Sequence, residues 1–203
     1  LEGLKDLSLT TNGALLAEPA PDRREAGRQR INVSIDTLKA DRFRDLTKRG
    51  NLDDVLKGLF AAQKAGMSPV KINAVVIRGI NDDEILDLAG FARENGFEMR
   101  FIEYMDVGNS NAWSLEKTVT KKEILDTVHA RFPVRELGRA NGSAPAVDYE
   151  FLDGAGLARR LEARELASPE IERLVTDMID TLTDSGGIGL AAPQIDESVR
   201  LAI

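Results

Sequence analysis

Hydrophobic and polar residues alternate along residues 30–37, which read RINVSIDT. In an extended strand, Ile31, Val33 and Ile35 point to one face, and the polar residues between them point to the other. A strand covered by helices on both faces is normally apolar throughout. The pattern therefore predicts a strand with one buried face and one polar face, which contacts either solvent or a ligand.

Three other segments, residues 6–10, 70–77 and 98–105, carry related patterns. Helical periodicity separates residues 30–37, 70–77 and 98–105, so the order of strand, helix, strand, helix and strand predicts an α/β fold with parallel, right-handed crossovers. Two interpretations of the polar faces are open at this point. They line a barrel or half-barrel that holds a polar ligand, or they form the solvated face of an ordinary sheet.

Four helices are expected, over residues 39–47, 51–65, from Asn81 to the residue before Gly96, and 119–131. For the third helix, Asn81 and Glu84 have the spacing of a capping box. Residues 132–138 and 147–152 are expected to be extended. His129 lies near the end of the fourth helix, where a surface position is a better interpretation than a metal ligand.

The composition suits a soluble globular protein of 203 residues, with 42% hydrophobic and 30% charged residues. A net charge of −7 argues against a general binder of nucleic-acid polymers or membrane surfaces. We find no apolar run long enough to span a bilayer and no signal peptide, and we expect a cytoplasmic protein. With no cysteine and one histidine, the usual ligand sets of iron–sulfur clusters and zinc sites cannot be assembled, so no metal site is predicted.

Four motifs occur in one half of the chain: TTNG at 10–13, RINVSIDT at 30–37, VKINAVVIRGINDDE at 70–84 and RFIEYMDVG at 100–108. In order and spacing, residues 1 to about 155 resemble the GTP 3′,8-cyclases of molybdenum-cofactor biosynthesis, which are radical S-adenosylmethionine enzymes. The resemblance implies a partial (β/α) barrel with the cofactor at the carboxyl ends of the strands.

The resemblance implies that Thr10 and Lys71 lie at positions that contact GTP. A lysine offers a cation to a triphosphate, and a threonine hydroxyl hydrogen-bonds to ribose or base. Arg100 is a further candidate for binding phosphate or carboxylate. The alternative for Lys71 is an ion pair with an inward-facing acid such as Asp36.

Ser34 and Met105 match positions that contact S-adenosylmethionine in this family. The family also implies iron–sulfur clusters, but its cluster-binding cysteines have no counterpart in the chain. Reductive cleavage of the sulfonium needs such a cluster. We therefore expect the chain to retain at most a binding wall, meaning one side of the site that binds GTP and S-adenosylmethionine.

Residues from about 157 to 203 resemble the amino-terminal part of peptide deformylase, an α+β enzyme with a divalent metal. The match rests on a preceding helix and on GIGLAAPQ at 187–194. It implies that Gln194 hydrogen-bonds near the metal-bound water and that the backbone N–H of Leu190 helps to stabilise an oxyanion. The family's metal ligands, a cysteine and a HExxH helix, are absent.

Two domains are therefore expected, at residues 1–155 and 156–203. Three hypotheses about function follow. The chain is a cyclase-derived enzyme fragment, a deformylase-type hydrolase fragment, or a non-catalytic product of two joined partial genes that is inert or binds nucleotide weakly. The oligomeric state is not predicted.

Overall fold

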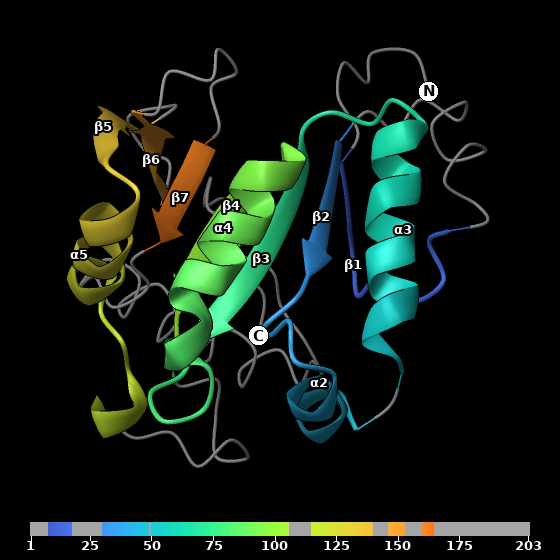
Figure 1. The fold of residues 1–203 in the computed structure, drawn as a ribbon, viewed down its shortest axis with the longest axis horizontal. Helices are drawn as coiled ribbons and strands as arrows, with labels where there is room; N and C mark the ends of the chain where they lie inside the picture. Colours follow the sequence, from blue (N-terminus) through green and yellow to red (C-terminus); the bar gives the residue numbers. More distant parts are fainter. Residues whose placement is uncertain are drawn as a thin grey trace, which may run out of the picture.

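A computed structural model describes residues 8–17, 30–48, 50–105, 115–139, 146–152 and 160–164. These residues form one seven-stranded sheet in the order β1-β2-β3-β4-β7-β6-β5 (Figure 1). The strands are β1 (Ser8–Thr11), β2 (Arg30–Ser34), β3 (Val70–Val76), β4 (Glu98–Glu103), β5 (Val134–Gly138), β6 (Ala146–Phe151) and β7 (Arg160–Arg164).

Strands β1, β2, β3, β4 and β7 pair in parallel, and β6 and β5 add an antiparallel hairpin at one edge. The expected parallel crossovers of the first half are confirmed. Strand β7 was not expected: it comes from the segment that resembles deformylase, and it lies between β4 and β6. The expected deformylase-like helix and closing strand, after residue 164, lie outside the described residues.

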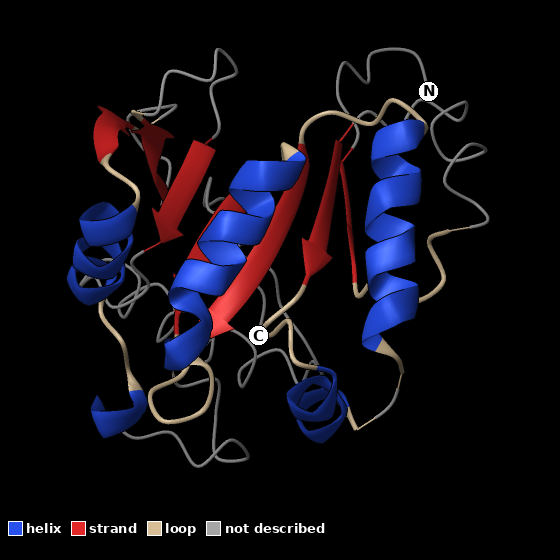
Figure 2. Ribbon diagram, viewed as in Figure 1, coloured by secondary structure: helices blue, strands red, loops and turns tan. Residues whose placement is uncertain are grey.

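The helices are α2 (Ala40–Thr47), α3 (Leu52–Lys64), α4 (Ile85–Asn95) and α5 (Lys121–Arg131), with short 3₁₀ turns η1 (Asp82–Glu84) and η2 (Leu115–Lys117). Helices α3 and α4 cover the near face of the sheet in Figure 2, and α2 lies beyond the carboxyl ends of the strands. The positions of all four agree with the expected helices to within a few residues. Among the residues that the structure describes, no helix is long and apolar enough to cross a membrane.

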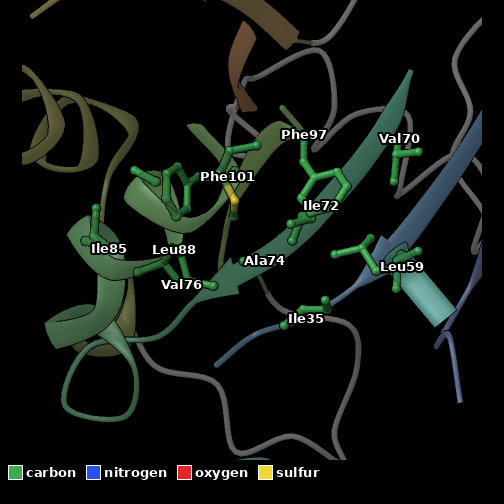
Figure 3. Close-up of a cluster of buried hydrophobic side chains, with 14 of the residues drawn as sticks. Ile35, Leu59, Val70, Ile72, Ala74, Val76, Ile85, Leu88, Phe97 and Phe101 are labelled. Carbon is green, nitrogen blue, oxygen red and sulfur yellow. The ribbon is translucent and has the colours of Figure 1, made fainter. Parts of the chain in front are cut away.

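The core lies between these helices and one face of the sheet (Figure 3). Every second residue of β2 and β3 is buried there, as the alternating pattern predicted. Ile31, Val33 and Ile35 have no exposed surface, and α3 and α4 contribute Leu59 and Leu88. Burial of this apolar surface holds the helices against the sheet and directs the intervening polar residues to the opposite face.

Candidate functional site

The polar side chains of the parallel strands fall into two rows across the sheet. Thr10, Asn32, Lys71 and Glu98 are successive register partners from β1 to β4. Ser34, Asn73 and Arg100 form the next row toward the carboxyl ends. Residues in register on parallel strands share a face, and neighbouring strands are about 4.8 Å apart. The fold therefore brings four of the candidate residues predicted from the sequence onto one polar face.

In the first row, two pairs of side chains interact. The Asn32 side-chain amide donates to Thr10 Oγ1 at 3.1 Å. Lys71 Nζ lies 2.9 Å from Glu98 Oε2, and the two side chains are only 14% and 18% exposed. The acid that pairs with Lys71 is therefore Glu98 and not Asp36, the example expected from the sequence. Glu98 takes that place because its register on β4 puts it directly opposite Lys71.

In the second row, the side-chain amide oxygen of Asn73 differs from most buried polar atoms. Its side-chain Oδ1 is buried and has no hydrogen-bond partner among the described residues. Buried polar atoms are nearly always hydrogen-bonded, so this oxygen is an exception among the described residues. Ser34 and Arg100 lie on either side of Asn73 in the register.

Beyond the second row, the carboxyl ends of β2 and β3 are joined through Asn81. Its amide group donates to the backbone carbonyls of Asp36 at 2.7 Å and Val75 at 2.8 Å, and its Oδ1 accepts from the N–H of Ile77 at 2.7 Å. Asn81 therefore stabilises the strand ends and does not cap the following helix, so the predicted capping role is wrong. Its Oδ1, the atom that a helix cap would need, accepts from Ile77 instead.

Asp36 also contacts β3 at the carboxyl end of β2. Its Oδ1 accepts a hydrogen bond from the N–H of Val75 at 2.8 Å. Burial raises the pKa of the Asp36 carboxyl, and the hydrogen bond from Val75 only partly opposes that effect.

Glu84, at the start of α4, forms hydrogen bonds with the loop that follows β2. Its carboxylate is fully buried and accepts hydrogen bonds from the Thr37 hydroxyl at 2.6 Å, the Leu38 N–H at 2.8 Å and the Arg42 guanidinium. The carboxylate is thus turned toward a distant loop instead of the N–H of Asn81. This is why the predicted capping box does not form.

Asp83 lies beside Glu84 but on the surface. It pairs with Arg42 Nη1 and with Lys39 Nζ, each at 2.6 Å, and its side chain is 50% exposed. Arg42 and then Lys39 lower the pKa of the Asp83 carboxyl to about 2. Together with Glu84, these ion pairs fix the position of α2 beyond the strand ends.

Of the remaining candidates, Met105 lies two residues after the end of β4 and is half-buried. Gln194 and Leu190, the deformylase-like candidates, lie outside the described residues. His129 is exposed and its Nδ1 accepts from the N–H of Val134 at 3.2 Å, as expected of a surface histidine. Across the described part of the chain, no group of three or more His, Cys, Asp or Glu side chains is placed to hold a metal ion.

Asn73 and Glu98 were not among the site residues predicted from the sequence. The signal for both was the strand period: Asn73 lies two residues after Lys71 on the same face. The register that aligns Glu98 with Lys71 depends on pairing between distant strands, which a single sequence does not display.

Two family models match separate parts of the chain. Residues 1–92 match the model of the radical SAM superfamily, and residues 157–203 match that of polypeptide deformylase. The parallel strands β1, β2 and β3 and helices α2 and α3 lie within the first match. Strand β7 lies inside the deformylase match.

Residues 1 to about 155 are also similar to GTP 3′,8-cyclases. The chain is 46% identical over 153 residues to GTP 3′,8-cyclase 3 of Mycobacterium bovis, covering 75% of this chain and 40% of that protein. It is 45% identical over 157 residues to the GTP 3′,8-cyclase of Xanthomonas campestris pv. campestris, covering 77% and 46%. The chain thus spans less than half the length of these curated relatives.

Among solved structures, a radical SAM methyltransferase from Sphaerobacter thermophilus aligns with a TM-score of 0.47 and 17% identity. The alignment covers 61% of this chain and 37% of the methyltransferase.

Proposed function

We propose that the polar face of the parallel sheet is a binding wall for GTP and S-adenosylmethionine, derived from a GTP 3′,8-cyclase. The similarity of about 45% over three quarters of the chain supports this origin. The observation that carries the proposal is the pair of polar rows, because a buried core strand has no reason to present lysine, asparagine and arginine on one face.

Lys71 is the residue proposed to bind the GTP triphosphate, with Thr10 and Arg100 beside it on the same face. The Lys71 ammonium is held by Glu98 within a largely buried setting. A triphosphate carries more charge than one carboxylate, so it competes with Glu98 for the ammonium. Ser34 and Met105, at the carboxyl ends of β2 and β4, are proposed to contact S-adenosylmethionine.

The donor set does not fit the iron–sulfur clusters that the radical SAM family implies. Thiolates are the usual cluster ligands, and the 203 residues contain none. We derive no radical step for these residues and propose that on their own they bind ligands without turnover. Similarity changes from the cyclases to deformylase near residues 155–157, so we propose a fusion of two partial domains, 1–155 and 156–203.

A second candidate function is deformylation, favoured by the match over residues 157–203. In that proposal, Gln194 and the backbone N–H of Leu190 belong to an incomplete site. A chain with no cysteine and one histidine lacks the donors for the catalytic metal, so binding by the sheet is the better-supported function.

Calorimetric titration with GTP tests the proposal, using iron-free protein and two variants of one ion pair. Lys71→Ala should lower the affinity by about tenfold or more, because it removes a cation that contacts phosphate. Glu98→Gln should raise the affinity by a few fold, because it removes the competing carboxylate. Absence of binding by the parent chain, or equal affinities in all three proteins, would overturn the proposal.

A further inference from the structure

A cavity of about 410 Å³ lies where the carboxyl ends of helices α4 and α5 meet the hairpin of β5 and β6. The residues that line it are Arg93, Glu94, Arg131, Phe132, Pro133 and Phe151. This volume is typical of sites that hold small organic molecules. Helix α4 packs on the core face of the sheet, so the cavity is separate from the polar rows on the opposite face.

The Phe132 ring forms a fixed apolar wall of this cavity. A Cβ added to Gly90 of α4 would lie 3.5 Å from Phe132 Cζ, so the ring packs close to the helix backbone. Phe151 meets the ring almost perpendicularly, with 6.2 Å between the ring centroids. The N–H of Phe132 donates to the carbonyl of Val128 at 2.7 Å and holds the backbone at the end of α5. The wall is therefore in place before any ligand binds, which lowers the entropic cost of binding.

Two guanidinium groups lie beside the same ring. Arg93 Cζ is 5.2 Å from the centroid of Phe132, and Arg131 Cζ is 5.1 Å from it. Both distances fall within the roughly 6 Å range of a cation–π interaction. The N–H groups of a guanidinium lie in its own plane, so a guanidinium over a ring can still donate to an anion at its edge. Arg131 is exposed, and no carboxylate among the described residues pairs with it.

Helix electrostatics account for part of this arrangement. Arg93 and Arg131 each lie in the last turn of a helix, where the helix dipole favours a cation. That effect favours a positive charge near each helix end, but it does not require both side chains to converge on one ring beside a cavity. Glu94 is exposed and adds one negative charge, so the described lining keeps a net positive charge in a chain of net charge −7.

We infer that this cavity binds a small anion joined to an aromatic ring, with an aryl phosphate as the representative ligand. The anion accepts hydrogen bonds from Arg93 and Arg131, because guanidinium groups match phosphate oxygens in geometry and charge. The aromatic ring of the ligand packs against Phe132 and Phe151. The site shares no residue with the proposed wall for GTP and S-adenosylmethionine, so it is a second and independent binding site.

Two-dimensional amide NMR spectra of the isotope-labelled chain, titrated with phenyl phosphate, test this site. Saturable shifts are expected at Phe132 and Phe151. Phenyl phosphate should bind about tenfold more tightly than inorganic phosphate, because only the aryl compound has a ring to pack. Arg131→Gln should weaken phenyl phosphate by about tenfold, the size expected for a hydrogen bond between charged groups.

Arg135→Gln is the matched control. Arg135 is exposed on β5, pairs with Glu150 at 2.5 Å and does not line the cavity. This variant should bind phenyl phosphate within about twofold of the parent. Unchanged amide shifts in the rest of the sheet report that both variants are folded.

Three results would overturn the inference. The first is no saturable shift at Phe132 and Phe151 with about 50 mM phenyl phosphate, and the second is equal affinity for inorganic phosphate. The third is an equal loss in Arg131→Gln and Arg135→Gln, because binding would then depend only on surface charge. Lys71→Ala should bind phenyl phosphate as the parent does, and a tenfold loss there would instead place the anion on the polar face. Since the GTP titration uses a different face, either proposal can fail while the other stands.

Discussion

Replacing Glu84 should destabilise the protein far more than replacing its neighbour Asp83. Both carboxylates bind Arg42, but the Glu84 side chain is 1% exposed and the Asp83 side chain is 50% exposed. Glu84 also receives hydrogen bonds from Thr37 and Leu38. Its removal leaves these buried donors and a partly buried guanidinium without their acceptor, and breaking such a buried pair costs about 3–5 kcal/mol.

We therefore expect Glu84→Ala to lower the free energy of unfolding by about 3–4 kcal/mol. This is a large part of the roughly 5–15 kcal/mol available to a domain. Asp83→Ala should cost about 0.5 kcal/mol, since solvent screens an exposed pair. Glu84→Gln should fall between the two, because one oxygen can still accept from Leu38 or Thr37.

Urea-induced unfolding followed by far-ultraviolet circular dichroism measures all three variants. The slope of free energy against urea concentration should not change, because the surface exposed on unfolding is the same. Equal losses of unfolding free energy in Glu84→Ala and Asp83→Ala would refute the reasoning, because burial would then not affect how much a carboxylate contributes to stability. A loss below about 1 kcal/mol for Glu84→Ala would refute it as well.

Two further predictions concern a helix cap and a helix contact. Hydrogen bonds from Thr120 and then Arg78 lower the pKa of Glu123 to about 2, so its contribution should be present above its usual pKa near 4.5 and lost as the pH falls toward 2. Urea titrations should show that Glu123→Gln costs about 1 kcal/mol at pH 7 and clearly less near pH 2, and a pH-independent cost would contradict this. Gly58→Ala should lower the midpoint temperature of thermal unfolding, although alanine favours helices more than glycine does. The added Cβ would lie 2.6 Å from the carbonyl oxygen of Gly13. A raised midpoint temperature would contradict this, because the backbone would then have moved to make room.

The sequence was enough to predict the two-faced strands, because alternation is a local property of the chain. Val33 and Ser34 differ in burial for the reason that the pattern indicates: adjacent residues of a strand point to opposite faces. The parallel order also followed from helices placed between consecutive strands. Most of the residues on the candidate ligand face could therefore be named without coordinates.

The errors involve partners distant in the sequence. Asn81 has the local spacing of a cap, but its side-chain amide donates to the backbone carbonyl of Asp36, 45 residues away in the sequence. Strand β7 reads RLEAR, with charged residues that suggest no strand, and pairing with β4 and β6 determines its structure. The partner of Lys71 and the buried oxygen of Asn73 likewise depend on register.

Amide hydrogen exchange with and without GTP tests most directly whether the polar face of the sheet is the ligand face. The account predicts that saturating GTP slows exchange in peptides containing the carboxyl ends of β2, β3 and β4, and leaves α3 and α5 unchanged. In Lys71→Ala the same GTP concentration should give little or no slowing. Slowing confined to the helices, or none anywhere in the parent chain at millimolar GTP, would contradict the central claim.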